Sequence, residues 1–194
     1  MKMEIGQRSS NAYRARLALG LTVLGAVARL LPHPPNLTPV GATSLFAGAR
    51  LKSWQAYLIP LVLMAITDPI LSALYGYPVF RPLTPVIYGS FLINVWIGRR
   101  LLKAVNPSRV AFAAALCSIQ FFVLTNVGVW LMGGLYPQTV TGLIACFAAA
   151  VPFFGRTLAG DFLYSGLLFG LDAWLGRLLP SGKRVPSASA TLRA

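Results

Sequence analysis

Apolar stretches of helical length alternate with short polar segments along most of this 194-residue chain. A helix that crosses a bilayer needs about 20 mostly apolar residues, and prolines or glycines mark where most of these stretches stop. The pattern predicts an all-α membrane protein built as a bundle of six transmembrane helices. We expect these helices at residues 13–31, 39–51, 54–75, 84–102, 109–131 and 156–179.

Two stretches have lengths that do not fit a simple span. The segment 39–51 is rich in small residues and too short to cross upright, so we expect a tilted helix or one buried in the bundle. The apolar stretch 139–179 is too long for one span and too short for two with a loop between them. Because Pro152 and Gly155 interrupt it, we expect an outer half-helix before the last span.

The distribution of charge supports a membrane protein and orients it. Only 11% of the residues are charged, where a soluble domain carries roughly 25%. Fourteen of the 17 Lys and Arg residues fall into four groups separated by apolar stretches, at 2–16, 50–52, 99–109 and 177–193. Cationic loops stay on the cytoplasmic side, so the pattern predicts a multi-pass protein with both termini in the cytoplasm. The net charge of +13 then indicates contact with anionic membrane lipid and not with nucleic acid.

The chain divides into one domain and two terminal segments. Residues 1–12 form a basic cytoplasmic segment, and residues 13–179 form a single six-helix transmembrane domain. Residues 180–194 are basic and rich in Ser, Pro and Ala, which predicts a disordered cytoplasmic tail.

Most catalytic chemistry has no support in the sequence. Cys117 and Cys146 lie inside apolar runs without a metal-ligand spacing, and His33 is the only histidine, so we expect no metal site and no cofactor. Two aspartates within predicted spans, Asp68 and Asp161, resemble the pair of an intramembrane aspartyl protease. However, the Gly-x-Gly-Asp sequence of that class lacks its first glycine before Asp161, and Asp68 follows Thr67 where the class has tyrosine. The chain carries no nucleophile elbow and no phosphate-binding Gly-rich loop. We therefore expect a protein that is not an enzyme.

Polar residues inside the predicted spans point to one end of the bundle. By helix rise, Arg29, Asp68, Asn126 and Asp161 all reach the outer third of the membrane. Ionisable groups at such depths are costly and mark functional sites by default. We expect a cavity bounded by the first, third, fifth and sixth helices beneath proline-rich loops, with each aspartate within reach of an arginine.

Structural explanations stay open for the same residues. Asp68 precedes a proline, so its role could be purely structural: to stabilise the kink or to pair with an arginine. In that case Arg29 would stabilise the bundle and would not bind a ligand. Asn126 equally suits an interhelical hydrogen bond, and His33 equally suits an ordinary loop position. Asp172 lies close to Arg177, which favours a structural ion pair near the inner boundary.

Two segments carry a family resemblance. The first is Arg29-Leu-Leu-Pro-His-Pro-Pro-Asn-Leu-Thr-Pro-Val-Gly-Ala42, and the second runs from Tyr136-Pro-Gln-Thr139 through Pro152-Phe-Phe154 to Gly160-Asp161. They resemble the signature of an uncharacterised group of bacterial transport-type proteins. That group is similar to the S-components of energy-coupling-factor (ECF) vitamin transporters.

The resemblance implies a substrate-binding subunit of the bacterial inner membrane. Such a subunit holds a vitamin-like molecule on the extracytoplasmic side, beneath loops after its first and third helices. It docks onto a coupling subunit driven by two ATPases, through small residues on the first helix. The nearest equivalents in this chain are Ala18, Thr22 and Ala26.

The function predicted from the sequence is therefore capture of a small solute for transport. Guanidinium groups suit carboxylate or phosphate, which favours a polar or anionic solute. The alternative is a structural or assembly subunit of a membrane complex, with Gly166 and Gly170 as a docking stripe that would equally suit packing within the chain. The candidate substrate-binding residues are Arg29, His33, Asn36, Asp68, Arg81, Asn126, Arg156, Asp161 and Tyr164.

Overall fold

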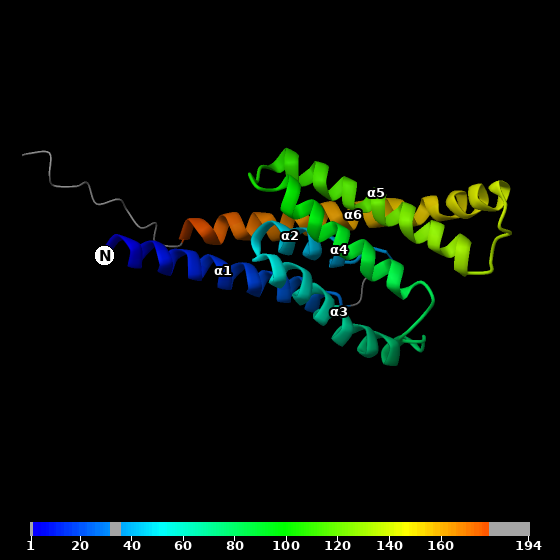
Figure 1. The fold of residues 1–194 in the computed structure, drawn as a ribbon, viewed down its shortest axis with the longest axis horizontal. Helices are drawn as coiled ribbons and strands as arrows, with labels where there is room; N and C mark the ends of the chain where they lie inside the picture. Colours follow the sequence, from blue (N-terminus) through cyan, green and yellow to red (C-terminus); the bar gives the residue numbers. More distant parts are fainter. Residues whose placement is uncertain (1, 32–35, 179–194) are drawn as a thin grey trace, which may run out of the picture.

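The computed structural model describes the backbone of residues 2–31 and 36–178 and the side chains within these ranges from residue 15 onward. All regular structure within these ranges is helical, as predicted (Figure 1). The predicted tail at 180–194 lies outside the described residues. The helices are α1 (Lys2–Ala28), α2 (Val40–Arg50), α3 (Ser53–Tyr75), α4 (Thr84–Leu101), α5 (Pro107–Met132) and α6 (Val140–Leu178).

Successive helices run in opposite directions along one long axis (Figure 1). The start of α1, the connections 51–52 and 102–106, and the end of α6 therefore lie at the same end of the molecule, which we term the cationic end. The connections 76–83 and 133–139 lie at the other end, which we term the outer end. Within the described residues, each of the four groups of cations has members on the elements that meet at the cationic end, as the charge pattern predicted.

The short helix α2 is the centre of the bundle. Every residue from 40 to 48 is buried, and α2 packs against all five other helices. Small residues make this possible, because a β-carbon at Gly48 would overlap the Val95 carbonyl and one at Gly98 would overlap the Leu45 carbonyl. The expectation of a helix buried in the bundle is confirmed, and the reason is backbone-to-backbone contact between α2 and α4.

The predicted break in the last apolar stretch is wrong. Helix α6 is continuous over 39 residues with Pro152 inside it, so no separate outer half-helix precedes the last span. A straight helix of this length is about 58 Å long, more than a bilayer is thick. Proline removes a single backbone donor, and transmembrane helices tolerate that loss because neighbouring groups satisfy the freed carbonyl. Helix α3 contains Pro60 and Pro69 in the same way.

Three helices, α3, α5 and α6, are long and apolar enough to cross a membrane. Helix α1 adds a shorter apolar segment, Ala15–Ala28, and its first residues are helical from Lys2 onward. Large apolar side chains such as Leu74, Phe112 and Ile144 are exposed on the outside of the bundle. A protein in water rarely exposes so much contiguous apolar surface, and the chain is therefore a membrane protein.

Candidate functional site

An open cavity of about 260 Å³ lies toward the outer end between α4, α5 and α6. We term it the outer cavity. Its walls are mostly aromatic and aliphatic, with a few polar side chains, which is the usual composition of a small-molecule site. The lining residues are Asn36, Leu83, Ile87, Phe121, Phe122, Thr125, Asn126, Val129, Ala150, Phe153, Phe154 and Thr157.

A narrow extension of about 50 Å³ continues toward the centre of the bundle and shares Asn36, Phe121 and Thr157 with the outer cavity. We term this extension the polar recess. It ends against Asn94 and Asp161, beside the first turn of α2. Its volume is enough for about one or two water molecules or for the polar head of a ligand.

Asp161 is almost completely buried, with 4% of its surface exposed. One carboxylate oxygen, Oδ2, accepts a hydrogen bond from the Ser118 hydroxyl at 2.6 Å, and the backbone N–H of Ala42 donates to the same carboxyl group. The other oxygen, Oδ1, occupies the space that a side chain at Gly41 would need. Helix α2 has no side-chain cap of its own at Pro39, so Asp161 on α6 caps it from across the bundle.

Asn94 brings a second buried polar group to the polar recess. Gln120 donates from Nε2 to the Asn94 side-chain carbonyl at 2.6 Å and to the Ser90 carbonyl at 3.1 Å. The Asn94 Nδ2 group and the Gln120 Oε1 atom are buried without a hydrogen-bond partner among the described residues. Buried polar atoms are nearly always paired in folded proteins, so these two atoms make this the least completely hydrogen-bonded part of the recess wall.

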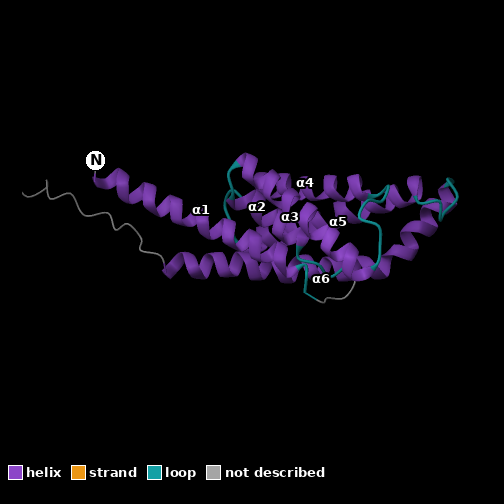
Figure 2. Cartoon of the chain, turned by 90° about the horizontal axis from the view of Figure 1, so that it is seen from below, coloured by secondary structure: helices purple, strands orange, loops and turns teal. Residues whose placement is uncertain are grey.

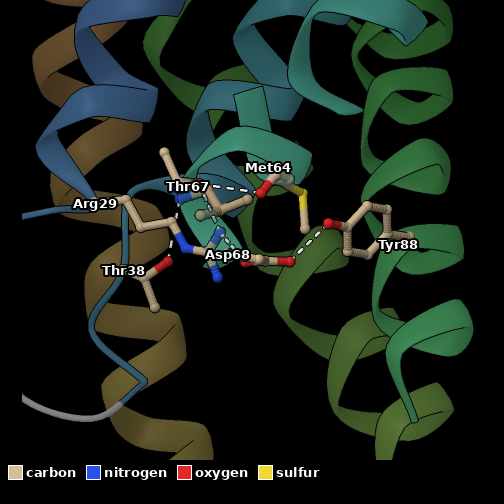
Figure 3. A network of polar contacts seen from close by, with 7 residues as sticks. Arg29, Thr38, Met64, Thr67, Asp68 and Tyr88 are labelled. Carbon is tan, nitrogen blue, oxygen red and sulfur yellow. Dashed lines mark hydrogen bonds and ion pairs between the residues drawn. The ribbon is translucent and has the colours of Figure 1, made fainter. Parts of the chain in front are cut away.

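A separate polar network joins α1, α3 and α4 (Figure 3). Arg29 Nη1 lies 2.5 Å from Asp68 Oδ1 and donates to the Thr67 hydroxyl at 3.0 Å. The Tyr88 hydroxyl donates to the other Asp68 oxygen at 2.6 Å. Both charges are thus neutralised within the chain, and neither Arg29 nor Asp68 lines the outer cavity or the polar recess.

The structure brings together only part of the predicted site. Asn36, Asn126 and Asp161 line the cavity or its recess. The cavity is bounded by α4, α5 and α6, so the prediction that the first and third helices enclose it is wrong. The prediction of an arginine near each aspartate is confirmed for Asp68 but wrong for Asp161, which has no ion pair within the described part of the chain.

The remaining candidates lie elsewhere. Arg81 is exposed and its guanidinium lies 4.6 Å from the centre of the Tyr77 ring, while Arg156 is exposed on α6. Tyr164 is half-buried against the hydrophobic core. His33 falls outside the described residues.

The small residues predicted to dock a coupling subunit face inward. Ala18, Thr22 and Ala26 are buried, and Thr22 donates its hydroxyl to the Ala18 carbonyl at 2.8 Å. The adjacent Gly25 leaves no room for a β-carbon against Thr43 of α2. This stripe therefore packs within the chain and is not available to a partner in this conformation.

The sequence alone did not identify Ser118 and Gly41 as the residues that hold Asp161. A signal was present for Gly41, because a glycine in the first turn of a short buried helix leaves its amides open to a neighbouring side chain. Ser118 carried no such signal, since a serine within an apolar helix more often bonds to the carbonyl four residues before it. Ser118 makes that bond as well, to Ala114 at 3.2 Å.

A larger cleft of about 550 Å³ lies at the cationic end, where α1 and α6 separate (Figure 2). Its charged lining includes Arg50 and Asp172, which form an ion pair at 2.7 Å. The expectation of a structural ion pair at Asp172 is confirmed, with Arg50 of α2 and not Arg177 as the partner. The outer cavity remains the better candidate site because it adjoins the polar recess, whose lining residues Asn94 and Asp161 are buried and where the Asn94 amide is incompletely paired.

The chain was compared with known proteins. A family of unknown function, DUF6580, matches residues 9–182. No curated protein matches the chain, and neither does any solved structure. The match spans nearly the whole chain, so the protein belongs to the DUF6580 family.

Proposed function

We propose that this member of the DUF6580 family is a membrane protein that captures a small, vitamin-sized solute from the extracytoplasmic side for transport. The outer cavity, with its buried and incompletely paired polar recess, is the observation that carries this proposal. A volume of about 260 Å³ lies just below the range typical of drug-sized ligand pockets, roughly 300–1,000 Å³, which suits a small solute.

The orientation rests on the charge pattern. The elements that carry the described members of the four cationic groups meet at one end of the bundle, and the outer cavity lies toward the other. By the positive-inside rule, the cationic end and both termini are cytoplasmic in a bacterial inner membrane, and the cavity faces outward. In this proposal all six helices belong to the membrane domain, with α2 held inside the bundle by the other five.

The energy for transport comes from partner subunits in this proposal. The sequence has no phosphate-binding loop of the Gly-x-x-x-x-Gly-Lys-Ser/Thr type, so an ATP-driven step requires separate ATPases. An energy-coupling-factor module, with its coupling subunit and ATPases, is the partner that the sequence resemblance implies.

Filling the cavity tests the proposal. The change Ala150→Phe places a ring in the cavity wall, while Ala149→Phe makes the same substitution at the neighbouring exposed position. We expect at least one compound of a vitamin panel to raise the unfolding temperature of the purified protein and of the Ala149→Phe variant, but not of Ala150→Phe. A panel without any effect, or equal binding by both variants, would reject the proposal.

One observation favours the alternative, an assembly subunit of a membrane complex. Gly166 and Gly170 are exposed on α6, and a β-carbon at either would meet open space, so this stripe does not serve packing within the chain. Small residues on a lipid-facing surface allow another helix to approach closely. Under this alternative, Gly166→Leu would abolish co-purification of a membrane partner, and Ala150→Phe would have no effect on it.

A further inference from the structure

We propose that the solute of the outer cavity is a small organic cation, with its protonated nitrogen held by Asp161 in the polar recess. This inference rests on the proposed function and adds the chemical class of the substrate. It replaces the anionic solute that the arginines of the sequence suggested. The carboxyl group and the aromatic walls of the site support it, and Asn94 adds a requirement for an acceptor on the ligand.

The outer cavity and the polar recess contain an acidic side chain and no basic one among their described lining residues. Asp161 is the one charged residue among the described residues that line the outer cavity and the polar recess. Its present partners, the Ser118 hydroxyl and the Ala42 amide, are dipoles without a net charge. A buried carboxylate is best balanced by a cation, and a ligand can bring that cation with it. An anionic solute would instead be repelled, because no guanidinium or ammonium group lines this part of the described structure.

The walls suit a cation as well. Phe91 and Phe121 stack with ring centres 5.2 Å apart beside the polar recess, and Phe122 and Phe154 lie 4.9 Å apart in the wall of the outer cavity. The faces of aromatic rings carry negative partial charge and attract organic cations. The same rings provide flat apolar surface for the body of a ligand, which places a heteroaromatic or otherwise planar group between the recess and the cavity mouth.

Asn94 adds a requirement next to the charged nitrogen. Its unpaired Nδ2 group is a donor, and Asn94 lines the polar recess together with an acceptor, Asp161. A ligand head with a protonated nitrogen and a neighbouring carbonyl or ring heteroatom would satisfy both groups. A site with such buried polar groups discriminates strongly against analogues that leave them unpaired.

Three probes of nearly equal shape test this inference: benzamidine, which is a cation, benzamide, which is neutral, and benzoate, which is an anion. Binding is measured with the full chain purified in detergent, by calorimetry and by the shift in unfolding temperature. We expect benzamidine to bind most tightly and benzoate most weakly. In Asp161→Asn, benzamidine should lose at least about tenfold in affinity and bind no better than benzamide. The matched control Asp172→Asn, at the cationic end, should bind benzamidine as the natural protein does.

A second variant keeps the test valid where Asp161→Asn fails to fold. Phe154→Leu preserves an apolar wall but removes the ring face, so it should weaken benzamidine more than benzamide. Equal weakening of both probes, or a preference for benzoate in the natural protein, would overturn the inference. Binding of benzoate or benzamide that Ala150→Phe abolishes would leave the proposed function intact while the cation inference fails. No binding of any probe rejects the cation inference, and a vitamin panel without effect would reject the proposed function as well.

Discussion

The two aspartates toward the outer half of the bundle have opposite environments. Asp68 of α3 is paired with Arg29 and accepts a hydrogen bond from Tyr88, and 15% of its side chain is exposed. Asp161 of α6 is more deeply buried, has no cation beside it within the described structure, and is held by a hydroxyl and by an amide at the start of α2. Asp68 is thus paired with a cation inside the protein, whereas Asp161 has only uncharged hydrogen-bond donors beside it.

This difference separates structure from function in the candidate site. A carboxylate that already has its cation gains little from a charged ligand, so the network around Asp68 serves to join α1, α3 and α4. A carboxylate held by dipoles at the end of a cavity can accept a cation without breaking an existing ion pair. We therefore expect Arg29 and Asp68 to stabilise this side of the bundle, and under the proposed function Asp161 is the residue that recognises the ligand.

The largest expected effect comes from removing the second carboxylate. Asp161→Ala removes two hydrogen bonds to a carboxyl group, leaving the Ala42 amide buried without that acceptor and the Ser118 hydroxyl with the Ala114 carbonyl alone. We expect a loss of about 2–5 kcal/mol in the free energy of unfolding. Denaturant unfolding in detergent measures it. Asp161→Asn is the control, because its side-chain carbonyl can still accept one of the two bonds and should recover part of the loss. A loss below that of Arg29→Ala would contradict the role of Asp161 as the cap of α2.

Removing the cation of the first network should have a smaller effect. Arg29→Ala leaves Asp68 with Tyr88 as its remaining partner at a partly exposed position, and we expect a loss of about 1–3 kcal/mol in the free energy of unfolding. The double variant Arg29→Ala with Asp68→Asn should be more stable than Arg29→Ala alone, because the unpaired charge is gone. Ligand binding by the cavity should remain. If Arg29→Ala lost ligand binding and kept its stability, Arg29 would instead be a substrate-binding residue, which would contradict this account.

The smallest effect should come from the hydroxyl of this network. Tyr88→Phe removes one hydrogen bond to Asp68 but keeps the ring and the Arg29 ion pair, and we expect a loss of about 0.5–1.5 kcal/mol in the free energy of unfolding. The same unfolding experiment measures it. An effect as large as that of Arg29→Ala would contradict the ranking, because the Tyr88 hydroxyl would then contribute as much to stability as the ion pair does.

The helices were largely predictable from the sequence. Apolar length, prolines and glycines placed α2 to α5 within about two residues of their observed bounds, which is the normal disagreement at helix ends. The length of the segment 39–51 predicted a tilted helix or one buried in the bundle, and α2 is buried. The break expected in α6 failed because a proline in a membrane helix costs one hydrogen bond and need not end the helix. The start of α1 was missed because its first turns are polar and give no apolar signal.

The candidate site was less predictable, for a geometric reason. Counting residues along a helix gives the depth of a side chain, and Asp68 and Asp161 were both expected at the outer depth. The rotation of a helix about its axis decides which neighbour a side chain meets, and helices that are apolar on all sides carry little information about rotation. Asp68 therefore contacts Arg29 and Tyr88, while Asp161 contacts the start of α2. For the same reason α4 lines the cavity, where the first and third helices were predicted.

One accessibility measurement tests the central claim, a water-filled cavity open to the outside, most directly. Thr157 lines both the outer cavity and the polar recess, so a cysteine at this position reports on the cavity in intact cells. The background is a chain in which Cys117 and Cys146 are alanine. Control cysteines replace Pro78 in the exposed connection at the outer end and Lys52, which is exposed at the cationic end.

A membrane-impermeant thiol reagent added from outside should label the cysteines that replace Thr157 and Pro78, and should label the one that replaces Lys52 only after the cells are permeabilised. Labelling of the Lys52 position from outside would contradict the orientation. Failure to label the Thr157 position while the Pro78 position reacts would contradict the open cavity, and with it the proposal that this protein captures a solute there.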